Sequence, residues 1–179
     1  AESIGMKVIY YDKKEKLSLG NAKKYNSLNQ LIKASNIISI HVDGKKENTD
    51  LIDKNEFEIM KKGTILINYS RGNVINISEL KKNILSGKIY GTAIDVFPKE
   101  PKNNKQKFSS ILVGLPNTIL TPHIGGSTKE AQKNIGTFVP NKVIDFINTG
   151  ATQNSVNFPS IVLPELKNAH RFIHIHKKN

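Results

Sequence analysis

The sequence contains no cysteine, and only two of its 27 basic residues are arginines. Without cysteine there is no disulfide framework, no thiolate metal site and no thiol nucleophile. No run approaches the roughly 18 consecutive apolar residues that a membrane span needs. The first residues also lack the charged and apolar regions of a signal peptide. We therefore expect a cytoplasmic protein without a membrane segment, and no metal site.

The net charge of +12 raises the question of nucleic-acid binding. The lysines are scattered over loops and expected helix ends, with no interleaved aromatic residues and no recognition-helix pattern. This favours a solvated, lysine-rich surface over a nucleic-acid partner. Because lysine serves almost everywhere else, Arg71 marks a position that needs a planar, bidentate group.

Short apolar runs alternate with helices that begin at capping signatures. The expected strands are 7–11, 36–42, 64–68, 90–96 and 118–121. The capping residues are Ser27, Asp53, Asn76 and Ser127, and the last helix extends to about Asn148, with Pro140 interrupting or bending it. Because parallel neighbours need crossover helices, this alternation predicts an α/β fold with a doubly wound parallel sheet.

Each expected strand carries polar residues at or just beyond its carboxyl end. They are Asp12, His41, Ser70 with Arg71, Asp95 with Glu100, and His123. Ligands of such sheets bind beyond the carboxyl ends of the strands. We therefore expect these side chains to contribute to one site.

Three of these residues suit acid/base chemistry on a carboxylate substrate. His123 follows a rigid proline and precedes two glycines, which let a ligand approach the backbone closely. Glu100 would orient the imidazole and favour its protonated form, and Arg71 would bind a carboxylate through two hydrogen bonds. Gly72, which follows Arg71, would let the backbone pass close to a ligand. Taken singly, they could be a histidine in a turn, a loop carboxylate and a surface arginine. Together they suit hydride transfer between NAD and a 2-hydroxy or 2-keto acid.

Asp12 ends a strand where a dinucleotide-binding fold holds the adenosine ribose. A carboxylate there favours NAD and repels a 2′-phosphate, although a simple strand-end acid is the alternative. Dinucleotide-binding folds carry a glycine-rich turn about 20 residues before the acidic residue that binds the ribose. If Asp12 is that residue, the turn would lie upstream of residue 1. Asp95 likewise could be a turn-forming aspartate or lie near the nicotinamide.

Segments 68–72 (N-Y-S-R-G), 91–101 and 121–136 resemble the D-isomer-specific 2-hydroxyacid dehydrogenases. The resemblance implies a Rossmann-like NAD-binding domain with His123 as acid/base, Glu100 as its partner and Arg71 as the substrate-orienting residue. It also implies that NAD is contacted by Asp12, His41, Tyr69, Ser70, Arg71, Asp95, His123, Ile124, Gly125 and Gly126. The motifs most resemble those of the enzymes that oxidise 3-phosphoglycerate to 3-phosphohydroxypyruvate at the start of serine biosynthesis, which implies a homo-oligomer when complete.

The same resemblance divides the chain into four parts. They are an NAD-binding domain (1–127) without its first strand and glycine-rich turn, a helix leading to a substrate domain (128–149), a linker (150–168), and the start of an ACT regulatory domain (169–179). Residues 171–176 are expected as a strand. His176 matches a regulatory histidine, but Lys178 stands where the family has a serine-binding asparagine, which argues against feedback inhibition.

Residues 1–179 lack a substrate domain and a glycine-rich turn, so we expect little or no activity from this chain alone. Two alternatives remain. The chain could be a non-catalytic remnant or interaction module from a truncated or split gene. It could also belong to a dehydrogenase for another D-2-hydroxy acid.

Overall fold

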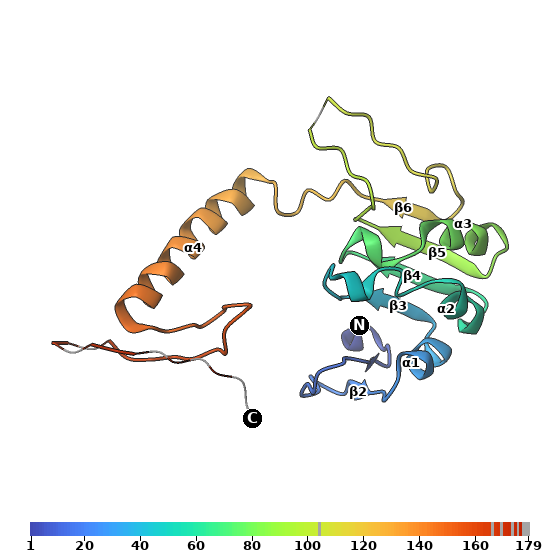
Figure 1. The fold of residues 1–179 in the computed structure, drawn as a ribbon. Coiled ribbons are helices and arrows are strands. Elements are labelled where there is room, and N and C mark those ends of the chain that lie inside the picture. Colours follow the sequence, from blue (N-terminus) through green and yellow to red (C-terminus); the bar gives the residue numbers. More distant parts are fainter. Residues whose placement is uncertain (104, 166, 169, 173, 175, 177–179) are drawn as a thin grey trace. The chain divides into compact units, whose positions relative to one another are not determined.

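The computed structural model describes residues 1–103, 105–165, 167–168, 170–172, 174 and 176. The chain divides into two compact units, Ala1–His123 and Ile124–Asn179. Unit 1 contains the parallel sheets and unit 2 the long helix α4 (Figure 1). Across the described part of the chain, no helix combines the length and apolar character required to cross a membrane.

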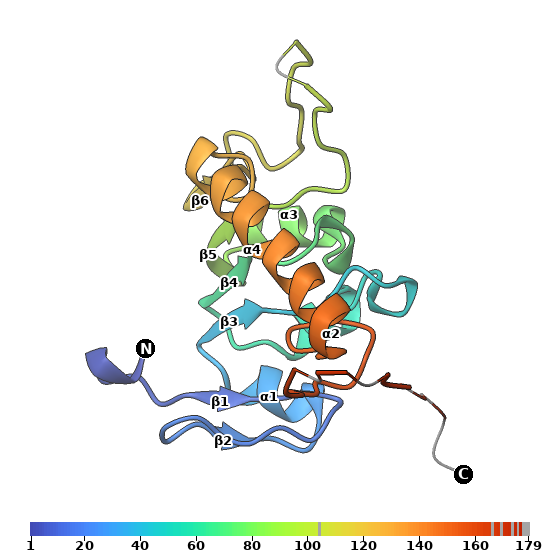
Figure 2. The same cartoon turned by 90° about the vertical axis from the view of Figure 1, so that its left-hand side faces the viewer.

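Unit 1 is built on a four-stranded parallel sheet with the order β3-β4-β5-β6. Its strands are Ile37–Ile40, Thr64–Asn68, Ile89–Ile94 and Thr118–Leu120. The Cα register places Ile40 opposite Asn68, Asn68 opposite Ile94, and Ile94 opposite Leu120. The four strands therefore end in line, and the loops that follow them start at one edge of the sheet, at the left of Figure 1 and facing the viewer in Figure 2.

The first predicted strand does not join this sheet. β1 (Ile9–Tyr10) pairs in parallel with β2 (Lys23–Lys24) in a separate two-stranded sheet. The sequence gives little sign of β2, because it consists of two lysines rather than an apolar run. The prediction of a parallel α/β fold is confirmed, whereas the expectation that all five strands share one sheet is wrong.

The α-helices of unit 1 lie side by side, α1 (Leu28–Ala34) against α2 (Lys54–Ile59) and α2 against α3 (Ile77–Leu85). Successive right-handed crossovers between parallel strands place α2 and α3 on the same face of the sheet. A doubly wound arrangement with a second helical layer stays a prediction. Short 3-10 helices, η1 (Glu2–Ile4), η2 (Lys46–Asn48) and η3 (Gly72–Val74), complete the unit.

The capping signatures of unit 1 form as predicted. The Ser27 side chain accepts a hydrogen bond from the backbone N–H of Gln30, and Asp53 and Glu56 make a reciprocal capping box. The Asn76 side chain accepts from two backbone N–H groups of α3. These bonds satisfy N–H groups that the helix itself leaves without partners, so the sequence alone determines where the helices begin.

The hydrophobic core lies within unit 1, between the sheet and the helices. Its buried residues are Ile32, Ile38, Ile40, Ile52, Phe57, Met60, Leu66, Val74, Ile75, Leu80, Ile84, Ile89, Ile94, Phe97 and Leu112. Strand β4 alternates buried and half-buried residues, because successive side chains of a strand point to opposite faces of the sheet and only one of these faces is fully covered. The core thereby fixes the sheet edge from which the functional loops project.

Replacing Leu80 with alanine should lower the free energy of unfolding by about 2–5 kcal/mol, because truncating a fully buried leucine leaves a cavity. Leu85 lies on the same helix but is 61% exposed, so Leu85→Ala is the matched control, with an expected change within about 0.5 kcal/mol. Urea denaturation followed by circular dichroism measures both variants. Equal losses would contradict this assignment of the core.

Unit 2 is dominated by α4 (Lys129–Thr149), which has no buried residue. Its N-cap is Thr128, whose side chain accepts from the N–H of Ala131, so the predicted cap at Ser127 is wrong by one residue. The helix also continues through Pro140 without interruption. It ends at Gly150, which has a φ of 72° and suits the left-handed cap.

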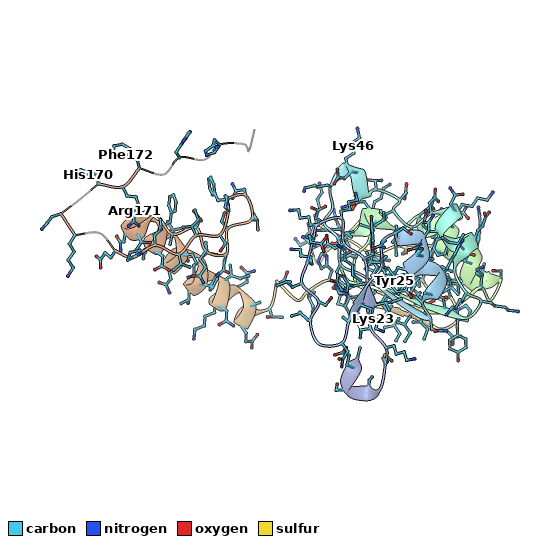
Figure 3. The ribbon with its side chains drawn as sticks, turned by 90° about the horizontal axis from the view of Figure 1, so that it is seen from below. Lys23, Tyr25, Lys46, His170, Arg171 and Phe172 are labelled. Atoms are coloured by element: carbon cyan, nitrogen blue, oxygen red, sulfur yellow. The ribbon has the colours of Figure 1, made fainter. Side chains whose placement is uncertain are left out.

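After α4 the chain has no regular element among the residues that the structure describes. Thr152 organises residues 152–161, because its hydroxyl donates to the carbonyl of Pro159 and accepts from the N–H of Ile161. Arg171 donates a hydrogen bond to the carbonyl of Thr149 at the end of α4, and Phe172 beside it is exposed (Figure 3). The strand expected over 171–176 is not formed at its described residues. Lys178, the position expected to bear on serine regulation, lies outside the described residues.

Candidate functional site

The sequence-predicted residues of the four-stranded sheet gather at the edge where its strands end. His41 follows β3, Ser70 and Arg71 follow β4, Asp95 follows β5, and His123 follows β6. Because the last residues of the four strands are in register, these positions lie one to three residues beyond a common line. His41 has a local partner, since its Nε2 lies 2.8 Å from the Ser39 hydroxyl.

His123 and Glu100 form a direct pair. The Nδ1 atom of His123 lies 3.0 Å from Oε1 and 2.9 Å from Oε2 of Glu100. The Glu100 carboxylate is itself held by the backbone N–H of Phe97, which donates to Oε1 at 2.9 Å. In the neutral imidazole, a carboxylate at Nδ1 selects the tautomer that carries the proton there. Nε2 is then the ring nitrogen that is able to accept a proton.

A second carboxylate holds the backbone of His123. Asp95 Oδ1 accepts from the backbone N–H of His123 at 3.0 Å and from the Thr121 hydroxyl at 2.5 Å. His123 has a φ of 52°, a left-handed conformation that costs a non-glycine residue about 1–3 kcal/mol. The bond from its N–H to Asp95 helps to offset that cost and holds the backbone of His123 in this conformation. A contact between Asp95 and the nicotinamide stays a prediction.

Asn68, which the sequence reasoning did not single out, organises the loop that carries Arg71. Its Oδ1 accepts from the backbone N–H and the hydroxyl of Ser70, and its Nδ2 donates to the carbonyl of Arg71. Asn68 is buried, and a buried amide needs hydrogen-bond partners for both its oxygen and its nitrogen. These bonds supply them. An asparagine at the end of a strand and two residues before a serine is the signal that could have found it. Tyr69, between them, is 53% exposed.

The stem of Arg71 lies against Gly44, in the loop after β3. A Cβ added at Gly44 would be 3.1 Å from Arg71 Cγ, so a glycine leaves room for this stem. The Arg71 Nη1 atom donates to the carbonyl of Ser70 at 2.7 Å, and Asn73 Nδ2 reaches the carbonyl of Gly44 at 3.4 Å. The loops after β3 and β4 thus support the arginine from two sides.

Asp43 closes the loop after β3. Its carboxylate accepts from the side chain of buried Asn48 at 2.7 Å and pairs with Lys45 at 3.1 Å. The hydrogen bond from Lys45, with weaker help from Asn48, holds the pKa of Asp43 below its usual value of 3.8 against a smaller desolvation effect. Lys46, next in the chain, points outward (Figure 3). The negative form of Asp43 is therefore the one that orders this loop.

The order of residues 43–48 should depend on pH in one direction. A group with a depressed folded-state pKa stabilises the fold above its unfolded pKa, and this contribution is lost as the pH falls through the lower folded value. We expect the loop to keep its Asn48 bond at neutral pH and at pH 5, and to lose it only below the usual Asp43 pKa of 3.8. The side-chain amide signals of Asn48 in an NMR titration report this, with Asp43→Asn as the control that removes the transition. A transition above pH 5 would contradict the pairing.

Gly72 lies where a side chain would not fit. A Cβ added there would lie 2.1 Å from the carbonyl carbon of Phe97, so the backbone of Gly72 passes close to another loop of the same chain. A close approach of a ligand to this glycine stays a prediction. Gly125 and Gly126 differ, because a Cβ at either would meet nothing within 4 Å. The space next to these two glycines is therefore open.

Asp12 lies two residues beyond β1 and is half-buried. Its Oδ1 accepts from the backbone N–H of Lys14 at 2.8 Å, an arrangement that keeps the carboxylate at the strand end. Nearby on β2, the pKa of Lys24 is raised, first by its hydrogen bond to Glu15 and to a lesser extent by the charge of Asp12. A strand-end carboxylate with its remaining acceptor capacity suits the two hydroxyls of an adenosine ribose. The position and chemistry of Asp12 therefore fit the adenosine ribose of NAD.

A family model described as "D-isomer specific 2-hydroxyacid dehydrogenase, NAD binding domain" matches residues 1–125. The chain belongs to this family. The match covers all of unit 1, including the edge where the strands end. The family resemblance drawn from the motifs at 68–72, 91–101 and 121–136 is thereby confirmed.

Similar proteins in this family include two named D-3-phosphoglycerate dehydrogenase. The protein from Dictyostelium discoideum is 47% identical over 176 residues, and that from Escherichia coli K12 is 45% identical over 177. These alignments cover 98% and 99% of this chain but 43% of each relative, so the chain spans less than half of their length. A solved D-2-hydroxyisocaproate dehydrogenase is 34% identical with a TM-score of 0.73, covering 84% of this chain and 48% of that one. A D-lactate dehydrogenase from Sporolactobacillus is 29% identical with a TM-score of 0.70 and the same coverage.

Proposed function

We propose that this chain is the NAD-binding part of an enzyme that oxidises 3-phospho-D-glycerate to 3-phosphohydroxypyruvate, the first step of L-serine biosynthesis. The observation that carries the proposal is the bond from His123 Nδ1 to Glu100 at the edge where four parallel strands end. The choice of substrate rests on the relatives named D-3-phosphoglycerate dehydrogenase, which align with nearly the whole chain. A complete enzyme built on it is proposed to be a homo-oligomer.

His123 is the proposed general base for oxidation of the substrate hydroxyl. With Nδ1–H bonded to Glu100, Nε2 accepts the hydroxyl proton, and Glu100 stabilises the imidazolium that forms. Asp95 and Thr121 keep the imidazole in place during this transfer. In the reverse direction the same imidazolium returns the proton to the carbonyl oxygen.

Arg71 is the proposed binding group for the substrate carboxylate. Its guanidinium can bind both carboxylate oxygens, which fixes the orientation of C2 relative to the imidazole. Asn68 holds the Arg71 backbone, and Gly44 makes room for its stem, so the side chain is positioned before a substrate arrives. A lysine would bring the charge without the second hydrogen bond.

NAD is the proposed hydride acceptor, and when bound it would take the hydride from C2 of the substrate. Asp12 would accept hydrogen bonds from the hydroxyls of the adenosine ribose and would repel a 2′-phosphate. The further proposed contacts are His41, Tyr69, Ser70, Asp95, and the turn of His123, Ile124, Gly125 and Gly126. The open surroundings of the two glycines support that turn as a contact.

A chimeric enzyme tests the function directly. Residues 1–179 would replace the aligned segment of the Escherichia coli relative, which supplies the parts of the enzyme outside the alignment. We expect 3-phosphoglycerate-dependent production of NADH, measured by absorbance at 340 nm, and no such production by residues 1–179 alone. A folded chimera that oxidises D-lactate or another D-2-hydroxy acid but not 3-phosphoglycerate would overturn the proposed substrate. No oxidation of any of them would overturn the function.

A further inference from the structure

The backbone of Gly72 lies so close to the backbone of a second loop that a residue with a side chain would not fit in its place. A Cβ placed on it would be 2.1 Å from the carbonyl carbon of Phe97, 2.2 Å from its oxygen and 2.7 Å from the nitrogen of Pro98. Gly72 is not among the glycines with a positive φ, so the glycine is required by this contact and not by its own dihedral angles. Because both partners are backbone, neither can rotate away.

Each side of this contact is joined directly to a functional side chain. Arg71 precedes Gly72 in the chain, so the contact holds the arginine loop. On the other side, the N–H of Phe97 donates to Glu100 Oε1 at 2.9 Å, and Glu100 bonds His123 Nδ1. One path of contacts from the arginine to the histidine therefore crosses the contact between Gly72 and Phe97.

Hydrogen bonds at the bases of the two loops also join them, apart from the contact at Gly72. The N–H of Asp95 donates to the carbonyl of Asn68 at 3.1 Å, where β4 and β5 end, and Asn68 Nδ2 donates to the carbonyl of Arg71. Asp95 also bonds the N–H of His123. With both loops fixed at their bases, a group inserted between Gly72 and Phe97 would displace their tips, which carry the functional side chains.

We propose that Gly72 is a positioning residue, whose lack of a side chain sets the spacing between Arg71 and the pair formed by Glu100 and His123. The catalytic meaning of this spacing rests on the function proposed above, whereas the spacing itself is a property of this chain. An alanine would force the loops apart by more than about 1 Å before the carbon atoms reach an ordinary contact distance. A role in packing alone would leave the histidine and arginine unchanged.

Nitrogen-15 NMR of the 179-residue chain tests the spacing without any assumption about activity. The chain has five histidines and two arginines, so the ring nitrogens of His123 and Nε of Arg71 can be assigned with His123→Gln and Arg71→Lys. In Gly72→Ala we expect the Nδ1 signal of His123 to move toward its position in Glu100→Gln, and the Arg71 Nε signal to shift as well. Gly136→Ala is the matched control, because a Cβ there meets nothing within 4 Å.

Circular dichroism first shows whether the Gly72→Ala variant is folded. If it is not, the same substitution is made with Pro98→Ala, which removes the ring that restrains the opposing loop and lets that loop move. We expect the double variant to show the displaced His123 signal, and Pro98→Ala alone to keep the wild-type signal. A folded Gly72 variant with the wild-type signals of both His123 and Arg71 would overturn the proposal.

The chimeric enzyme gives the second measurement. We expect Gly72→Ala to lower kcat by about 10- to 100-fold while the KM for NAD changes little, because misplacing reacting groups by about 1 Å can cost 100-fold. Unchanged kcat together with unchanged NMR signals would refute the positioning role. If the chimera without Gly72→Ala has no activity, the proposed function fails, whereas the NMR experiment still decides whether Gly72 sets the spacing.

Discussion

Replacing His123 with alanine should lower kcat of the chimeric enzyme by about 100- to 10,000-fold, the contribution expected of a positioned general base. Glu100 and Asp95 hold the imidazole for this proposed role, through bonds to its Nδ1 and its backbone N–H. Steady-state rates of NADH formation at saturating 3-phosphoglycerate and NAD measure the effect.

A second histidine provides the control. His170→Ala removes an exposed imidazole from unit 2 and should leave kcat within about twofold of the parent enzyme. Thermal unfolding would establish that both variants remain folded. A folded His123→Ala enzyme with undiminished turnover would remove the proposed acid/base role.

Replacing Arg71 with lysine should lower kcat/KM for 3-phosphoglycerate by about 100-fold, because lysine keeps the positive charge but loses the fork that binds two carboxylate oxygens. The KM for NAD should change far less, since the guanidinium is proposed to act on the substrate. The loop itself should survive, because its internal bonds come from Asn68 and Ser70.

Arg171→Lys is the matched control, since Arg171 is the only other arginine. It bonds the carbonyl of Thr149 within unit 2 and should leave kcat/KM near the parent value. If Arg71→Lys raised KM for NAD as much as for 3-phosphoglycerate, Arg71 would be a cofactor ligand rather than a carboxylate ligand.

The sequence alone predicted the elements that depend on local signals. Strand β4 was expected at the residues where it forms, and three helices of unit 1 begin at their predicted caps. Capping depends on residues three positions apart, and a buried strand on a run of apolar residues, so neither needs knowledge of the rest of the chain. The family followed from motifs that are themselves contiguous.

The features that the sequence did not reveal have a shared physical cause. Strand β2 forms because its backbone pairs with β1, and its two lysines carry no apolar signal of that pairing. The role of Gly72 depends on Phe97, a residue 25 positions further along the chain, so no local pattern could reveal it. The sequence alone does not show whether a glycine lies next to a ligand or next to another segment of backbone.

The sequence by itself determined which side chains are proposed for acid/base chemistry and for binding a carboxylate, and that each follows the end of a strand. Only the tertiary structure decided which of them meet. The register of β3 to β6 brings the strand ends into line, and the bonds of Asp95, Asn68 and Glu100 then orient His123 and Arg71. Residue chemistry is a local property that can be read in order along the chain, whereas spacing depends on backbone contacts between residues far apart in it.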